Sequence, residues 1–304
     1  MPRLRYNPAM LAARRSLAFA AATVFFACTA HAQLHDQLER IAAQAQGRVG
    51  VACSLPGKAL DCDLSATSPY PMQSTFKLPI AVVALHQVEQ GKLSLDQTLH
   101  IVPSELAAPD DYSPLRDEHP HGAVDVSIRE LVQRAVTQSD NVAGDALLRT
   151  EGGGAAATAY FRSIGIDGIH IVYTEQQQNR DERLQYRNSA TPRAYVALLR
   201  RLADKSPLTP EHTRLLLDAM AASHTGDHRL KALLPPGTPV ADKTGTSGSG
   251  RPAVNATNDM ALISLPSGQK LAVAVLIADA KAPFAAREQV IAQIGKAIYD
   301  AATH

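Results

Sequence analysis

Residues 258–278 read NDMALISLPSGQKLAVAVLIA and hold two apolar, β-prone runs on either side of the turn residues Pro266-Ser267-Gly268. This pattern predicts two antiparallel strands joined by a tight connection. A closing helix is expected directly afterwards, because four apolar residues recur at helical spacing, namely Val290, Ile291, Ile294 and Ile298.

The beginning of the chain repeats this arrangement of helix and strand. Apolar residues at helical spacing predict a helix that ends at Gly47, namely Leu34, Leu38, Ile41 and Ala45. Alternating apolar residues then predict a strand, namely Val49, Val51, Cys53 and Leu55. A turn at Pro56-Gly57 predicts that Cys62 lies on a returning strand. We therefore expect both chain ends to build one antiparallel sheet flanked by helices, which is an α/β (α+β) fold.

The middle of the chain, from Ser74 to Met220, is typical of helices and loops. The expected helices are Leu78 to Gln90, Ile128 to Thr137, Asn141 to Arg149, Ala155 to Ile164 and Pro192 to Leu202. The predicted organisation is a discontinuous α/β domain, residues 33–72 and 221–304, with an inserted all-helical domain, residues 73–220. We expect the binding pocket in the groove between them.

The composition excludes several classes of protein. The 304 residues are 45% hydrophobic and 19% charged, and 30 Lys and Arg balance 29 Asp and Glu. This excludes a disordered tail and a strongly basic nucleic-acid binder, so no nucleic-acid partner is expected.

Residues 1–32 have the pattern of an export signal. Arg14 and Arg15 precede an apolar stretch, Leu17 to Ala27, that is too short to span a membrane, and Ala30-His31-Ala32 predicts cleavage before Gln33. The pattern predicts a periplasmic or secreted protein without a membrane anchor, and general secretion and the twin-arginine route both stay open. The remaining cysteines, Cys53 and Cys62, either form a disulfide across the expected hairpin or stay as two buried thiols.

Three short motifs bear side chains that can perform acyl transfer. Ser74-Thr75-Phe76-Lys77 precedes a helix, and a spacing of three puts a lysine amine beside a serine hydroxyl. Ser139-Asp140-Asn141 follows a helix, and Lys243-Thr244-Gly245 lies in a strand-like run. Each motif alone has an ordinary explanation: a surface lysine, a helix N-cap or an edge strand.

Taken together and in this order, the three motifs resemble those of the penicillin-recognising serine enzymes, and the chain resembles a class A serine β-lactamase. Glu175 and Asn179 resemble the pair that holds the hydrolytic water in the class A Ω-loop, expected here at about residues 170–190. The D,D-peptidases that share the first three motifs generally lack this glutamate. The resemblance implies the β-lactamase/D,D-peptidase-like fold and hydrolysis of β-lactams, with a D,D-peptidase or a non-catalytic penicillin sensor as the alternatives.

The resemblance also implies a role for each site residue. Ser74 is the expected nucleophile, Lys77 or Glu175 its base, Ser139 the proton donor to the ring nitrogen, and Glu175 the activator of water. The expected substrate-binding residues are Tyr112, Asn141, Asn179, Arg229, Lys243, Thr244, Gly245 and Thr246, and the oxyanion would meet the N–H groups of Ser74 and Thr246. We expect no metal, no organic cofactor and a monomer, whose partner is a small β-lactam.

The sequence departs from the class A pattern at several positions. Tyr173 and Asn188 replace an Arg and Asp pair that often braces the Ω-loop, so this loop must be held in another way. Gln73 replaces a frequent cysteine, and the stretch between Ser74 and Ser139 is longer than usual, around Leu106 to Val124.

Overall fold

The computed structural model describes residues 33–109, 111–247 and 255–304. The expected signal peptide, residues 1–32, and part of the Gly-rich stretch after Lys243 lie outside these ranges. Within them, no helix has the length and apolar character needed to cross a lipid bilayer.

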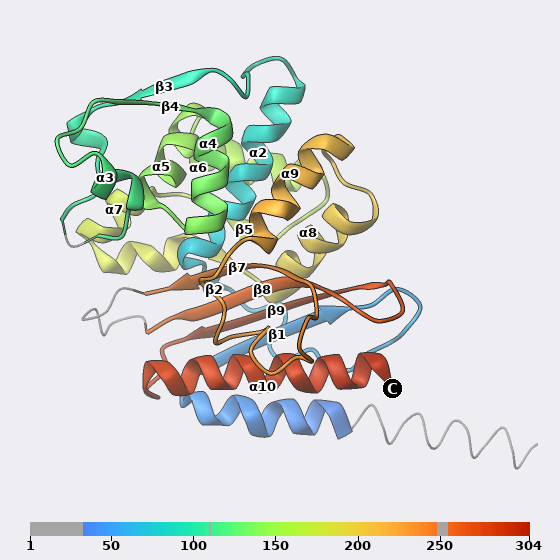
Figure 1. Ribbon diagram of the computed structural model, residues 1–304. Helices are drawn as coiled ribbons and strands as arrows, with labels where there is room; N and C mark the ends of the chain where they lie inside the picture. The colour runs from blue at the N-terminus through green and yellow to red at the C-terminus, as the bar shows by residue number, and fades with distance from the viewer. Residues whose placement is uncertain (1–32, 110, 248–254) are drawn as a thin grey trace, which may run out of the picture.

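The centre of the fold is a four-stranded antiparallel sheet with the order β1-β9-β8-β7. Its strands are β1 (Arg48–Ser54), β7 (Val240–Thr246), β8 (Thr257–Ser264) and β9 (Lys270–Ala278). The predicted pairing of the two terminal segments is confirmed, since Val51 on β1 lies opposite Val275 on β9. Figure 1 shows the sheet lying between two layers of helices.

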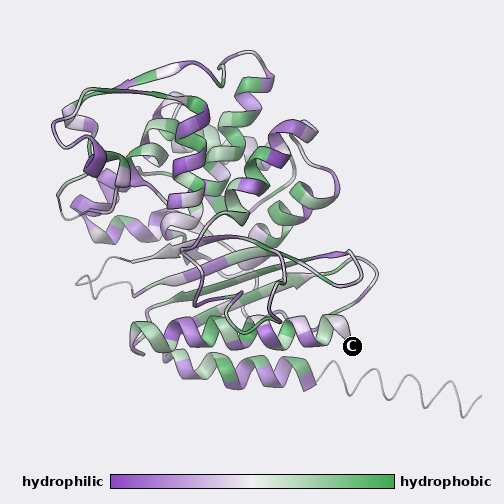
Figure 2. Cartoon of the chain, in the orientation of Figure 1, coloured by the Kyte–Doolittle hydropathy of each residue, from purple (hydrophilic) through white to green (hydrophobic). Residues whose placement is uncertain are grey.

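Alternating residues of the central strands point into two different cores, because successive side chains of a strand face opposite sides. Val273, Val275 and Ile277 pack with residues of the long C-terminal helix α10 (Phe284–Thr303). Ala272, Ala274 and Leu276 pack instead with the helical part of the chain. Both faces are therefore covered, which explains the continuous apolar runs of residues 260–263 in β8 and 271–278 in β9, where Figure 2 shows the sheet mostly green.

One face of the sheet carries α10 and a helix over residues 33–42. A close approach occurs where Gly295 of α10 meets Leu230, because a Cβ at Gly295 would lie 2.8 Å from the Leu230 carbonyl oxygen. The two predicted terminal helices are thus confirmed, and they form the outer layer of the sheet.

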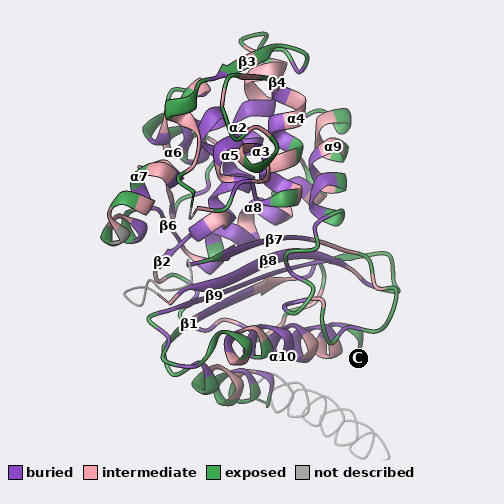
Figure 3. Cartoon of the chain, turned by 60° about the vertical axis from the view of Figure 1, so that its left-hand side comes forward, coloured by how far each residue is buried: buried purple, intermediate pink, exposed green. Residues whose placement is uncertain are grey.

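The other face carries the helical part, in which α8 packs on β1 and β9. Its helices are α2 (Lys77–Glu89), α3 (Pro114–Glu118), α4 (Ile128–Gln133), α5 (Asn141–Thr150), α6 (Gly154–Ser163), α7 (Glu175–Arg180), α8 (Pro192–Asp204) and α9 (Pro210–Ala221). Figure 3 shows α2 buried at its centre, consistent with the fully buried side chains of this helix. All five helices expected in this region are present, whereas α3, α7 and α9 were not predicted.

The helical part also contains strands, which corrects the expectation of helices and loops alone. Two short strands, β3 (Thr98–Ile101) and β4 (Val124–Ser127), pair with each other, and β2 (Tyr70–Pro71), β6 (Ser189–Ala190) and β5 (Ile169–His170) form a second small sheet. Ile101 lies opposite Val124, so the β3–β4 pair closes the base of the long 106–124 stretch.

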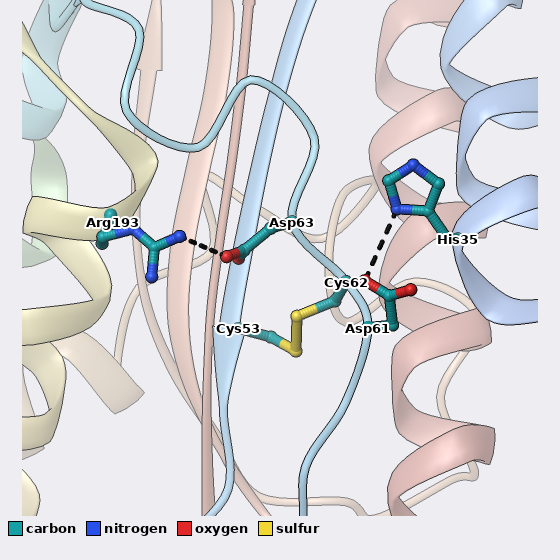
Figure 4. Close-up of a disulfide and its surroundings, with 6 residues drawn as sticks. All are labelled: His35, Cys53, Asp61, Cys62, Asp63 and Arg193. Carbon is teal, nitrogen blue, oxygen red and sulfur yellow. Dashed lines mark hydrogen bonds and ion pairs between the residues drawn. A yellow bond between two sulfur atoms is a disulfide. The ribbon is translucent and has the colours of Figure 1, made fainter. Parts of the chain in front are cut away.

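The expected hairpin after β1 is only partly present. The returning segment is not a strand and meets β1 at an isolated bridge, with hydrogen bonds of 2.8 and 3.0 Å between Val51 and Leu64. A disulfide joins Cys53 to Cys62, which resolves the alternative left open by the sequence. In Figure 4 the residues beside Cys62 turn outward, Asp63 toward Arg193 and Asp61 toward His35.

Candidate active site

The turn that carries Ser74 is held by the sheet beneath it. Residues Gln73–Phe76 form a 3₁₀ turn (η2) that leads into α2. Asn258 of β8 donates from its amide nitrogen to the carbonyls of Pro71 (2.8 Å) and Met72 (3.0 Å). Gly245 of β7 approaches the same turn so closely that a Cβ would lie 2.7 Å from the Met72 carbonyl oxygen. Glycine is therefore required there, and Ser74 is fixed relative to the edge of β7.

Lys77 lies beneath the Ser74 hydroxyl, as the spacing of three predicts. Its side chain is fully buried, and Nζ donates to Ser74 Oγ at 2.8 Å. The same nitrogen lies within hydrogen-bond distance of Asn141 Oδ1 (2.6 Å), Glu175 Oε1 (2.9 Å) and the Ser139 carbonyl (3.0 Å). Lys77 thus connects three of the four motifs that the sequence singled out.

Glu175 lies beside Lys77, and both side chains are within hydrogen-bond distance of the Ser74 hydroxyl. Its Oε1 accepts from Lys77 and, at 3.2 Å, from Ser74 Oγ. Glu175 begins α7, and its backbone N–H and that of Gln176 donate to the two carboxylate oxygens of Asp145 at 2.7 and 2.9 Å. Burial is the main cause that raises the pKa of Asp145 to about 7, and the nearby charge of Glu175 adds to it.

The Ω-loop is held by Asn188 in place of the missing ion pair. Its Oδ1 accepts from the N–H groups of Val172 (2.8 Å) and Tyr173 (2.9 Å), and its Nδ2 donates to the Tyr173 carbonyl (2.7 Å). Asn188 itself is completely buried, and its three hydrogen bonds are partly buried. One amide therefore clamps both peptide groups at the start of the loop.

Ser139 follows a π-helical segment, Arg134–Gln138, where the sequence predicted a continued α-helix. The segment ends with Ser139 in the left-handed region, at φ 62°, and the hydroxyl accepts from Lys243 Nζ at 2.8 Å. Asp140 has the ordinary role that the motif allows on its own: it caps α5 by accepting from the Ala143 N–H, and it also accepts from Ser113.

The edge of β7 supplies the other wall of the site. Lys243 is fully buried behind Ser139, and Thr244 donates to Thr225 Oγ1 at 2.7 Å. Burial is the main cause that lowers the pKa of Lys243 to about 7, with a contribution from the positive charge of Lys77 and opposing ones from Asp242 and Glu175.

Arg229, whose role toward the substrate stays a prediction, lies behind the wall of the cavity. It is 2% exposed and does not line the cavity. It donates to Glu288 (3.1 Å), Thr246 Oγ1 (2.6 Å) and the carbonyls of Gly245 (3.2 Å) and Asn258 (2.8 Å). The physical reason is that the strand carbonyls and Glu288 occupy its donors, so Arg229 positions Thr246.

A cavity of about 820 Å³ lies where these elements meet. The predicted residues that line it are Ser74, Tyr112, Ser139, Asn141, Glu175, Asn179, Thr244, Gly245 and Thr246. Lys77 and Lys243 lie buried behind this surface, whereas Tyr112, 57% exposed, lies in the loop before α3. The expected groove between the helices and the sheet is therefore the location of the site.

Sequence reasoning missed several residues of the cavity wall. Among them are Gln185, whose Oε1 accepts from Gln73 Nε2 at 2.5 Å, and Phe284 and Arg287 from the first turn of α10. No motif marks these positions, because their neighbours in space come from distant parts of the chain. No group of three or more metal-ligating side chains occurs within residues 33–109, 111–247 and 255–304.

The sequence and the fold both match known enzymes. Residues 33–302 match the Beta-lactamase2 model of the beta-lactamase enzyme family. The chain is 37% identical over 266 residues to the extended-spectrum beta-lactamase PER-1 of Pseudomonas aeruginosa, with 88% of this chain and 86% of that protein covered.

Solved structures of β-lactamases have the same fold as this chain. The crystal structure of a beta-lactamase from Chitinophaga pinensis matches with a TM-score of 0.84 at 37% identity. The match covers 89% of this chain and 100% of the Chitinophaga chain. A class A beta-lactamase from Bacteroides cellulosilyticus has a TM-score of 0.83 at 27% identity, with 90% and 98% covered. The chain belongs to the beta-lactamase enzyme family and is a class A β-lactamase.

Proposed function

We propose that the enzyme hydrolyses the β-lactam amide bond of penicillin-type and cephalosporin-type antibiotics through an acyl-enzyme on Ser74. One observation supports this above all: Ser74 Oγ lies 2.8 Å from Lys77 Nζ and 3.2 Å from Glu175 Oε1, which in turn lie 2.9 Å apart. A hydroxyl in contact with both an amine and a carboxylate has two groups that can take its proton.

In the acylation step, Ser74 Oγ attacks the β-lactam carbonyl carbon and its proton passes to Lys77 or, through water, to Glu175. The carbonyl oxygen becomes an oxyanion, which the N–H groups of Ser74 and Thr246 stabilise. The bond between the carbonyl carbon and the ring nitrogen then breaks. Ser139, which holds a hydrogen bond from Lys243, delivers its hydroxyl proton to that nitrogen and takes in its place the proton that left Ser74, relayed through Lys77.

Substrate binding is assigned to the cavity wall. Asn141 and Asn179 face the acyl side, where Asn141 already accepts from Lys77. Thr244, Gly245 and Thr246 form the strand edge that receives the other end of the substrate, and Lys243 supplies positive charge from behind it.

Deacylation requires water, and Glu175 is positioned to activate it. Its backbone is fixed by Asp145, and its carboxylate oxygen lies 3.2 Å from Ser74 Oγ at the cavity wall. In the proposed step, Glu175 takes a proton from a water held with Asn179. The resulting hydroxide attacks the ester carbonyl, and the proton returns to Ser74 as the product leaves.

The Glu175→Gln variant tests this mechanism. Loss of a general base typically slows a step by ~10² to 10⁴, so the acyl-enzyme should accumulate when this variant meets a penicillin. Intact-protein mass spectrometry should show a stable adduct that maps to Ser74, whereas the wild type should turn over.

Glu211→Gln is the matched control, because Glu211 is an exposed carboxylate on α9. It should behave like the wild type. Rapid turnover of Glu175→Gln without an adduct would remove this residue from the mechanism. A wild type that stops after one equivalent of nitrocefin would instead indicate a penicillin-binding protein or sensor.

We also propose that the enzyme works in the periplasm or outside the cell as a monomer. The Cys53–Cys62 disulfide supports an oxidising compartment.

A further inference from the structure

The segment that carries Tyr112 is braced by one arginine. We call residues 103–109 and 111–116 the Tyr112 wall, because Asp111 and Tyr112 line the active-site cavity. Arg116 donates its guanidinium N–H groups to three carbonyls of this segment, those of Ala107 (3.4 Å), Ala108 and Asp111 (2.9 Å). The Tyr112 wall is therefore held in one shape, and its position depends on how its two ends are attached.

One end of the Tyr112 wall is attached to the Ser139-Asp140-Asn141 motif. The Leu115 N–H donates to Asp140 Oδ2 at 2.6 Å, and Ser113 Oγ donates to Asp140 Oδ1 at 2.9 Å. Ser113 and Asp140 are both completely buried. This end is therefore fixed next to the catalytic groups.

The other end of the Tyr112 wall is attached to the Ω-loop. It begins with a 3₁₀ turn, η3 (Pro103–Glu105), whose Ser104 carbonyl accepts from Gln176 Nε2 at 3.0 Å. In the same turn, Glu105 forms an ion pair of 3.1 Å with Arg149 of α5. Gln176 thus connects the wall directly to α7, the helix that Glu175 begins.

The Ω-loop side of this contact is itself fixed. The backbone N–H of Gln176 donates to Asp145 at 2.9 Å, beside the bond of 2.7 Å from the Glu175 N–H to the same carboxylate. A change of the Gln176 side chain leaves both of these backbone bonds in place. A cavity of only about 10 Å³ separates the wall from the Ω-loop here, and its lining includes Glu105, Ala107, Asp111, Glu175, Gln176 and Asn179.

From this arrangement we propose that Gln176 is a specificity-determining residue. Its hydrogen bond to Ser104 sets the distance between the Tyr112 wall and the Ω-loop, and so limits the size of the acyl side chain that the cavity accepts. The inference rests on the proposed function, because it takes that side chain to lie between Asn179 and the Tyr112 wall. Without the bond, the wall keeps its attachment to Asp140 and can move away from α7.

Gln176→Met tests this inference, because it removes the donor and keeps a side chain of similar length and helix propensity. The substrates are two cephalosporins with the same ring and acetoxymethyl group: cefalotin, with a slender acyl side chain, and cefotaxime, with a bulky oxyimino side chain. The ratio of kcat/KM for cefotaxime to that for cefalotin should rise by about 2- to 10-fold, the range of one hydrogen bond, chiefly through a lower KM for cefotaxime.

The value of kcat for cefalotin separates this role from a structural one. It should change by less than about 2-fold, because Asp145 still holds Glu175 in the variant. A variant that merely loosened the Ω-loop would instead lose kcat for both substrates. Gln176→Lys should restore the wild-type ratio, since its ammonium group can donate to the Ser104 carbonyl. Gln133→Met is the matched control, because Gln133 is exposed on α4, and it should leave the ratio unchanged.

An unchanged ratio in Gln176→Met, an equal change for both substrates, or a Gln176→Lys variant that behaves like Gln176→Met would overturn the inference. If Gln176→Met does not fold, as judged by urea unfolding, Arg149→Met decides. It breaks the ion pair at the same end of the wall and should raise the ratio in the same direction, and no rise would overturn the inference.

The same measurements separate this inference from the proposed function. A wild type that hydrolyses neither cephalosporin and forms no adduct on Ser74 would contradict both. Steady hydrolysis of both substrates, with the same ratio in wild type and Gln176→Met, would contradict only the role of Gln176.

Discussion

The protonation of Lys243 depends on its burial and on four or more neighbouring charges of both signs. Its ammonium group is cut off from water and lies near Lys77, and both effects favour the neutral amine. Asp242 and Glu175 act in the opposite direction but do not compensate, and the pKa falls to about 7. Ser139, which accepts from Lys243, therefore has a neighbour that loses its proton within the working pH range.

This pKa predicts an alkaline limb in the activity of the free enzyme. Below pH 7 Lys243 is protonated and attracts the anionic substrate, so kcat/KM should fall as the pH rises through about 7. In the complex, the bound carboxylate raises the pKa of Lys243, so the decline in kcat should begin at a higher pH.

Lys243→Arg is the matching variant, because a guanidinium stays charged over this range. Its alkaline limb in kcat/KM should move to a higher pH, whatever the absolute rate. If pH profiles of the wild type and Lys243→Arg coincide, Lys243 is not the titrating group.

At the scale of elements, the Ω-loop is braced from two sides by neutral or backbone contacts. Asp145 on α5 holds the N-terminus of α7, and Asn188, just before β6, holds the peptide groups of residues 172 and 173. Thr174 caps α7 by accepting from the Gln177 N–H. The N–H groups in the first turn of α7, which begins at Glu175, are therefore held by Asp145 and Thr174, and the residues just before this helix are held by Asn188.

Replacement of Asn188 by Ala should destabilise this loop. Two N–H groups and one carbonyl, all in partly buried contacts, lose their partner, and we expect the free energy of unfolding to fall by about 2–4 kcal/mol. Deacylation should slow more than acylation, because Glu175 and not Ser74 depends on the loop. Urea unfolding and the amplitude of the nitrocefin burst measure the two effects.

Asn188→Asp provides the graded comparison, since it keeps the two acceptor contacts and loses only the donor to Tyr173. Its losses should be smaller than those of Asn188→Ala. Unchanged stability and turnover in Asn188→Ala would show that Asp145 alone holds the loop.

At the scale of the whole molecule, the site lies where two layers meet. Ser74 and Lys77 come from the start of α2, Glu175 from α7, and Lys243 from the edge of the sheet. The disulfide joins Cys53 of β1 to Cys62 in the segment that follows it, and since the two cysteines are only nine positions apart, its loop is short. The division into an α/β domain, residues 33–72 and 221–304, and a helical domain, residues 73–220, stays a prediction.

Export predicts a definite state of the mature protein. Protein recovered from the periplasmic fraction should begin at Gln33 and contain no free thiol, because Cys53 and Cys62 are joined. Cys53→Ser with Cys62→Ser should lower the free energy of unfolding by about 2–3 kcal/mol through the loop entropy of the unfolded chain.

N-terminal sequencing and a thiol-labelling reagent measure this state. A chain that lacks residues 1–32 and stays in the cytoplasm is the control, and it should be labelled. A periplasmic protein that retains residues 1–32, or that carries two reactive thiols, would contradict the prediction.

The sequence alone determined the features that depend on neighbours along the chain. Apolar periodicity predicted β8, β9, α10 and most of the helical part, and the spacing of three placed Lys77 beside Ser74. The resemblance to a known family then pointed to Glu175, since a carboxylate among glutamines has no pattern of its own.

Only the tertiary structure decided how side chains from distant segments share hydrogen bonds and space. It turned Arg229 inward onto Thr246, brought Arg287 into the cavity, and gave the loop of Tyr173 an amide clamp in Asn188. It also reduced the expected hairpin to two isolated bridges, Leu55 with Lys58 and Val51 with Leu64, and decided that Cys53 and Cys62 form a disulfide. The reason is physical: a periodic pattern reports which face of an element is buried, but the partner of a polar group depends on which donors and acceptors the packed fold leaves within reach.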